Sequence, residues 1–338
     1  MSLRARVALL VAVVLVAALG AAGYVAYARH RQASEAAHAP GVATTSLAAV
    51  TNVPHLVFRS TALGNGYGEV ALVPLSNPDG PRAFTGTPCD RVYARGGVAI
   101  CLAARRAAVT TYQSQLLGPA FKPLRNLPLS GLPSRARLSP DGTLTATTTF
   151  VYGDSYTNPG QFSTRTLLVR ATGQQVADIE QFRLLVDGRP LTTKDRNMWG
   201  VTFADDDTFY ATAASGARTW LVRGSLASGT MTALRADVEC PSLSPDHTRI
   251  AFKKRGALSR GHWRLAVYDL TTGRETLLAE QRSVDDQVEW LDNNTIVYGL
   301  PRTAANGADT DDVWAVPADG SGAARVFVHD AWSPAVIP

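Results

Sequence analysis

The sequence predicts an all-β protein, a six-bladed β-propeller closed by its C-terminal strand and preceded by one N-terminal transmembrane helix. A turn motif recurs in the second half of the chain, and a broken copy of it lies at the C-terminus. The copies begin at Leu138, Phe203, Leu243, Trp290 and Trp332, with separations of 65, 40, 47 and 42 residues. A period of roughly 40 to 45 residues is that of a propeller blade.

Each complete copy places a bulky apolar residue before two to four turn-forming residues and a Thr. The clearest copies contain Ser139-Pro140-Asp141 and Ser244-Pro245-Asp246. Pro presets φ, and Asp, Asn and Gly tolerate the backbone angles of a tight turn. We therefore interpret the motif as the turn between the first and second strands of a blade.

A 22-residue run without charged side chains, residues 7–28, is long enough to cross a bilayer as a helix, at about 1.5 Å per residue. Tyr24 and Tyr27 lie at its far end, where aromatic rings favour the membrane interface. A cleaved signal peptide is the alternative, since residues 20–23 supply small side chains. Arginines flank the run on both sides, so the charge rule hardly separates the two orientations. We expect residues 1–6 to form a cytoplasmic tail.

The rest of the chain divides into a tether and a propeller. Residues 29–52 are poor in side chains that could pack, so we interpret them as a flexible linker to a propeller spanning 53–338. Only three strands are apparent in the first blade, and we place the C-terminal strand there as the fourth, because this closes the ring. The expected blades are 56–84, 90–130, 136–191 with an insertion at 152–161, 199–237, 240–279 and 288–328.

Composition narrows the possible partners. The chain has 33 basic and 28 acidic residues, and without four N-terminal arginines and Glu35 the surplus falls to +2. The remaining chain carries no basic stripe interleaved with aromatics, so nucleic acid is not an expected partner.

The repeated Ser-Pro-Asp turns, the strand and turn at 265–273 and the returning C-terminal strand resemble the six-bladed TolB-like propellers. An apolar N-terminal segment before an Ala- and Arg-rich propeller is similar to the membrane-anchored TolB-like translocation proteins of actinobacteria. The resemblance implies an extracytoplasmic propeller that binds protein or peptide partners.

Cys89 and Cys101 are placed symmetrically about a hairpin with Gly at its tip. Opposite positions on paired strands come near disulfide distance, so a bridge is predicted, with two buried free thiols as the alternative. Cys240 is interpreted as a core residue, and the three cysteines do not form a metal set.

Acidic runs offer other chemistries. Residues 205–207 could bind calcium, but their alignment with the Ser-Pro-Asp motif favours a turn. Asp285-Asp286 and the acids of 309–312 could be paired carboxylates of a hydrolase or lyase, or solvated loop charges. No cofactor is expected.

We expect a propeller on the extracytoplasmic side of the cell membrane that acts as a binding or scaffold module. The alternative is a hydrolase or lyase that uses the loop carboxylates. A scaffold in the cytoplasm is a third possibility. In the blade scheme, the motif turns lie on one face, and the long loops and the links between blades lie on the other, which we call the mouth. Arg beside carboxylates and aromatics is typical of recognition surfaces. The partner-binding residues predicted at the mouth are Arg91, Asp154, Tyr156, Asp195, Arg196, Arg260, Asp285, Asp286, Asp312 and Trp332.

Overall fold

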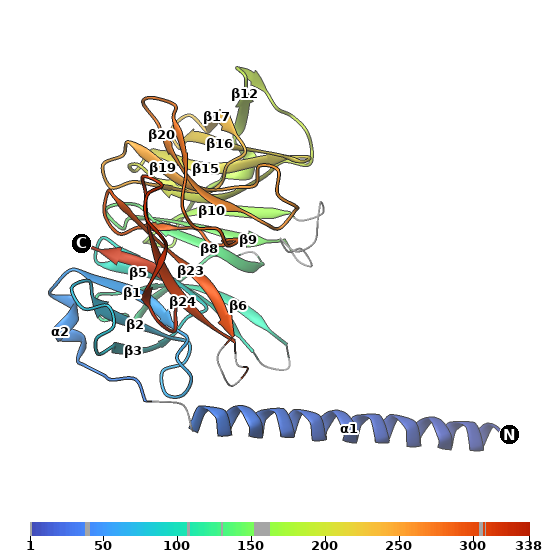
Figure 1. Ribbon diagram of the computed structural model, residues 1–338. Helices are drawn as coiled ribbons and strands as arrows, with labels where there is room; N and C mark the ends of the chain where they lie inside the picture. The colour runs from blue at the N-terminus through green and yellow to red at the C-terminus, as the bar shows by residue number, and fades with distance from the viewer. Residues whose placement is uncertain are drawn as a thin grey trace.

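The computed structural model describes residues 2–37, 41–106, 109–129, 131–151, 163–303, 307 and 309–338. Six sheets surround a common axis, as the sequence predicts, and a long apolar helix lies outside them (Figure 1). The helix, α1 (Leu3–Ala37), is apolar enough over Leu3–Arg31 to cross a membrane, with a mean hydropathy of 2.5, and none of that segment is buried against the propeller.

The ring is closed by the C-terminal strand, as expected. β26 (Ala331–Ile337) pairs antiparallel with β1 (His55–Ser60) and is the innermost strand of blade 1. The blade continues outward through β2 (Glu69–Pro74) and β3 (Ala83–Pro88). Because the two ends of the chain share one sheet, no blade is left with a frayed inner edge.

Four further blades run from inner to outer strand in chain order. Blade 2 contains β4 (Arg91–Arg95), β5 (Val98–Arg105), β6 (Thr111–Leu117) and β7 (Pro123–Leu127). Blade 3 contains β8 (Leu132–Leu138), β9 (Leu144–Phe150), β10 (Thr164–Arg170) and β11 (Gln175–Asp178). Blade 5 contains β18 (Glu239–Leu243), β19 (Arg249–Lys254), β20 (Arg264–Asp269) and β21 (Glu275–Leu277). Blade 6 contains β22 (Glu289–Trp290), β23 (Thr295–Thr303), β24 (Asp309–Pro317) and β25 (Arg325–Val328).

Blade 4 has six strands, which the sequence did not predict. To β14 (Asn197–Phe203), β15 (Thr208–Ser215), β16 (Arg218–Ser225) and β17 (Thr230–Ala236) it adds β12 (Arg183–Val186) and β13 (Arg189–Pro190). The expected third blade, 136–191, is therefore wrong beyond β11 and the short 3-10 helix η1 (Ile179–Gln181), because β12 pairs in parallel with β17. Burial explains the switch: Leu184 is fully buried in the core of blade 4, and the ring of Phe182 packs against Phe209. Figure 1 shows β12 projecting beyond the ring.

The expected flexible linker is partly ordered. α1 extends to Ala37, and a second short helix, α2 (Leu47–Thr51), follows Ser46, whose hydroxyl accepts from the Ala49 N–H. Val50 is buried in the core of blades 1 and 2, and Thr44 forms a parallel bridge with Arg82. Burial of an apolar side chain and backbone pairing thus attach this part of the tether to blade 1.

The Ser-Pro-Asp motif forms the turn that the sequence predicts. In blade 3 the Ser139 hydroxyl donates to Asp141 and accepts from the N–H of Leu144, and Gly142 has φ of 75°. In blade 5 His247 takes the same position with φ of 60°. The Asp205 carboxylate likewise accepts the N–H groups of residues 207 and 208, so the acidic run at 205–207 is a turn.

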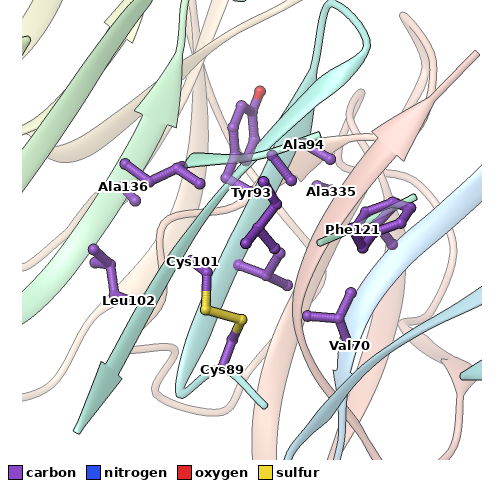
Figure 2. Close-up of a cluster of buried hydrophobic side chains, with 14 of the residues drawn as sticks. Val70, Cys89, Tyr93, Ala94, Cys101, Leu102, Phe121, Ala136 and Ala335 are labelled. Carbon is purple, nitrogen blue, oxygen red and sulfur yellow. A yellow bond between two sulfur atoms is a disulfide. The ribbon is translucent and has the colours of Figure 1, made fainter. Parts of the chain in front are cut away.

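One apolar cluster joins blades 1, 2 and 3. Figure 2 shows Val70 and Ala335 of blade 1, Leu102 of blade 2 and Ala136 of blade 3 around the disulfide between Cys89 and Cys101. The two Cα atoms are 5.5 Å apart, and the bridge ties the link between blades 1 and 2 to β5.

Candidate functional site

Blades 2, 3 and 5 and the link between blades 5 and 6 contribute charged side chains to the mouth of the central channel. Asp285 and Asp286 lie in the link before β22, Arg91 begins β4, and Arg135 lies in β8. Lys253 is the last buried residue of β19. The inner strands and the links between blades converge on the axis of a propeller, and the Lys253 side chain reaches this region from the second strand of blade 5.

Asp285 is held by two cations. Its Oδ1 lies 2.6 Å from Nζ of Lys253 and 3.2 Å from a guanidinium nitrogen of Arg135, while 47% of the Asp285 side chain stays exposed. Burial disfavours the ionised carboxyl, but the two cations outweigh it and lower the pKa of Asp285 below its usual range. The Lys253 side chain has no exposed surface, and its ammonium also lies 4.0 Å from the Trp263 ring centroid. Burial lowers the Lys253 pKa, yet neighbouring acidic groups, Asp285 among them, outweigh burial and raise it. Both groups therefore stay charged.

Asp286 is part of a buried bond network. One oxygen lies 2.8 Å from a guanidinium nitrogen of Arg91, and the other accepts the Gly299 N–H at 3.2 Å. The Arg91 guanidinium also lies 5.4 Å from the ring centroid of Trp332, in the closing strand. Burial, with help from the charge of Arg135, lowers the pKa of Arg91. These contacts connect blades 1, 2 and 6 at the point where the ring closes.

A second layer lies deeper in the channel. Arg137 stacks on the Tyr93 ring at 4.4 Å, is 3.5 Å from a Glu289 oxygen, and donates to two backbone carbonyls of the 287–288 segment. The Tyr93 hydroxyl donates to Glu289 at 3.3 Å. Burial raises the pKa of Glu289, and burial together with the Glu289 charge raises that of Tyr93 to about 12. Tyr93, Arg137 and Glu289 also line a small cavity of about 40 Å³, together with Pro140 and Pro245 of the Ser-Pro-Asp turns.

The remaining predicted residues that the structure describes do not join this cluster. Asp195 accepts hydrogen bonds from the Ser215 hydroxyl and the Gly216 N–H. These bonds lower the pKa of Asp195, and the bond from Ser215 has the largest effect. Arg196 donates to two carbonyls of the segment 182–191. Both residues thus brace blade 4 and its extension. The sequence placed them near the channel because it did not show that extension.

Asp312 and Arg260 also lie apart. The buried Asp312 pairs with Arg302 at 2.9 Å and accepts the Asp330 N–H, so it fixes the segment that leads into the closing strand. Arg260 is exposed in the loop between β19 and β20. Asp154 and Tyr156 lie outside the described residues.

Asp311, which the structure places in β24 and not in a loop, stands out among the acids that the sequence singled out. Burial, reinforced by the charges of Asp286 and Asp312, raises its pKa to about 6 against the opposing effect of Arg59. In the described part of the chain, no group of three or more His, Cys, Asp or Glu side chains is arranged to hold a metal ion.

Sequence reasoning missed Arg135, Arg137, Lys253 and Glu289. Arg135 and Arg137 lie two positions apart in β8, the strand that leads into a Ser-Pro-Asp turn. Only 6% of the surface of Arg135 and 8% of that of Arg137 is exposed. Charged residues two apart in an inner strand point to the same side of the sheet. That spacing next to a recognised turn was the signal available.

Comparison with known proteins identifies the architecture. No family model and no curated protein matches this chain. Among solved structures, TolB from Acinetobacter baumannii superposes with a TM-score of 0.56 at 16% identity, over 84% of this chain and 67% of that one. This chain has the TolB propeller fold.

Two further solved structures that superpose on this TolB-like propeller have lower TM-scores. A putative TolB from Agrobacterium tumefaciens gives 0.49 at 12% identity, covering 81% of this chain and 87% of that one. A puromycin-hydrolyzing peptidase from Mycobacterium tuberculosis gives 0.48 at 16% identity, covering 82% of this chain and 43% of that one.

Proposed function

We propose that this TolB-like propeller is a membrane-tethered binding or scaffold module that lies outside the cytoplasm and docks a protein or peptide partner over its mouth. The apolar helix α1 would supply the tether, in keeping with the resemblance to membrane-anchored translocation proteins. The disulfide supports the compartment, since disulfides persist in oxidising surroundings.

The observation that carries the binding role is that the charged groups at the mouth are paired across blades. Arg91 with Asp286, and Asp285 with Arg135 and Lys253, brace the inner strands into a rigid rim. A preorganised surface loses little conformational freedom when a partner docks. The half-exposed Asp285 and the exposed Arg260 would offer charges of both signs to that partner.

The hydrolase or lyase alternative has less support. A general acid at neutral pH needs a raised pKa, whereas the cations around Asp285 lower its pKa. Asp286 faces Arg91 and a backbone N–H, with 1% of its side chain exposed. Asp311, with a pKa near 6, is the carboxyl that an enzymatic role would use, and an Asp311→Asn variant tests that role in any turnover assay.

Orientation can be tested directly. Protease added to intact cells that express the full chain should remove the propeller and leave α1 protected in the membrane. A reporter on the N-terminus should stay inaccessible until the cells are lysed. A propeller that survives until lysis would reverse the proposed orientation.

Docking at the mouth can be tested with site-specific photocrosslinking in living cells. A photoreactive residue at position 260, on the mouth, should yield one specific adduct, whereas the same residue at Arg274, in the turn between β20 and β21 on the opposite face, should not. Asp285→Asn should weaken the adduct, and Asp319→Asn, on the opposite face, should leave it unchanged. If adducts formed only at position 274, the partner would bind the face opposite the mouth and the proposal would be wrong.

A further inference from the structure

A groove of about 660 Å³ separates blades 1 and 2, apart from the mouth cluster. Its walls come from β3 of blade 1 and from β5 and β6 of blade 2. Its charged and aromatic lining residues are Arg59, Tyr67, Asp90, Arg105, Arg106 and Lys122. A volume of this size lies within the range of about 300–1,000 Å³ that is usual for ligand sites.

The groove is strongly cationic. Four basic side chains face one carboxylate, Asp90, a surplus of three positive charges. Asp90 is already engaged, because it accepts the Ala104 N–H at 2.6 Å and pairs with Arg106 at 3.3 Å. Glu69, beside the lining, accepts the Gly86 N–H. Asp90 and Glu69 are thus committed to the protein itself, and Asp311 feels the charge of Arg59 without forming a salt bridge with it.

The other three cations contrast with those of the channel. In the channel, Arg91, Arg135 and Lys253 each have a carboxylate partner. Within the described residues, no salt bridge is formed by Arg59, Arg105 or Lys122. This concentration of positive charge attracts an anion.

The chain holds two of these cations in place. Lys122 donates to the Thr85 carbonyl at 2.8 Å, and Arg59 lies over the Tyr67 ring at 5.1 Å from its centroid, with a buried Nε that has no partner. The disulfide of Figure 2 fixes the wall between them, since Cys89 lines the groove and is bonded to Cys101 of β5. A ligand would therefore meet a largely preformed site.

The spacing of the cations favours an extended chain over a compact ion. Lys122 lies beside Gly86, and Arg59 lies beside Gly68, whose carbonyl accepts the Cys89 N–H. Gly86 and Cys89 are three residues apart on the β3 side, about 10 Å at about 3.3 Å per residue. One phosphate cannot reach both cations, whereas an extended peptide spans that distance in three residues.

We infer that this groove binds an acidic peptide segment, with carboxylates about three residues apart that pair with Arg59 or Arg105 at one end and with Lys122 at the other. Arg forks and carboxylates form the strongest paired hydrogen bonds available to exposed side chains. The site is separate from the partner surface proposed at the mouth, and each can fail without the other.

The probe is a fluorescent six-residue peptide with Glu at positions 2 and 5 and Gly or Ser elsewhere, titrated with the full chain in detergent micelles. At low salt we expect saturable binding that weakens as salt is added, since exposed ion pairs are screened. Replacing both Glu residues by Gln should abolish it. The double variant Arg105→Gln with Lys122→Gln should weaken binding at least about tenfold, the loss expected from two charge-assisted contacts.

A matched control removes two exposed cations elsewhere: Arg183→Gln with Lys194→Gln should bind as the unaltered chain does. The mouth variant Asp285→Asn should also bind normally, which separates this site from the proposed function. Equal binding by the groove variant, equal binding of the Gln peptide, or displacement by equimolar inorganic phosphate or glycerol phosphate would each overturn the inference.

Discussion

Removing the closing strand is the most severe test of the architecture. A chain that ends at Asp330 loses β26, which is paired with β1 at five register positions. At about 1 kcal/mol of net stability for each lost hydrogen bond, the backbone contribution is about 5 kcal/mol. Burial of Val336 adds about 2 kcal/mol, and the two buried Ala residues add about 0.8 kcal/mol each. The total, near 9 kcal/mol, is comparable to the whole stability of a typical domain, about 5–15 kcal/mol.

We therefore expect the truncated chain to lose cooperative unfolding. The assay is thermal and urea denaturation of the full chain and of the truncated chain in detergent, followed by near-ultraviolet circular dichroism. A chain that lacks only Pro338 is the control and should unfold as the full chain does. If the truncation to Asp330 kept the melting temperature within about 2 °C, closure by β26 would contribute little and the reasoning would be refuted.

Three further predictions concern one or two positions each. Gly299→Ala would place its Cβ 2.2 Å from the indole ring of Trp332 in the closing strand, so we expect the free energy of unfolding in urea to fall by about 1–3 kcal/mol. Gly41→Ala, whose Cβ meets nothing within 4 Å, is the neutral control. Equal losses in the two variants would show that the indole contact is not the cause. Burial raises the pKa of Glu180 to about 8, so the folded protein keeps a proton that the unfolded chain releases near pH 4.5. The free energy of unfolding should therefore fall by up to about 4 kcal/mol as the pH rises from about 4.5 to about 8. Glu180→Gln should flatten that decline, and an unchanged slope would contradict the assignment. The double variant Cys89→Ser with Cys101→Ser opens a loop with a sequence separation of 12 and should lose about 3 kcal/mol, whereas a difference under about 0.5 kcal/mol between it and the unaltered chain would show that the bridge adds little.

Part of the candidate site was readable from the sequence. Arg91, Asp286 and Trp332 were assigned to links and strands near the channel, and the structure brings them together. The partners of Asp285 were not readable, because Lys253 and Arg135 lie 32 and 150 residues away from it along the chain. A contact across the axis depends on how the blades are rotated around it, which no local pattern records. The same holds for the cationic groove, whose side chains come from strands of two blades.

The sequence by itself determined the turns, most of the strands and the closure of the ring. Pro, Asp and Gly at fixed offsets restrict φ and ψ locally, and the repeat length sets the size of a blade. It also determined the apolar helix, which depends only on a run of side chains. Only the tertiary structure decided that β12 joins blade 4. Leu184 is buried once β12 pairs with β17, and the paired residues lie 47 positions further along the chain. Only the tertiary structure decided which charges are paired inside the ring and which remain in the groove, since Coulomb energy depends on distances in space and not on positions along the chain.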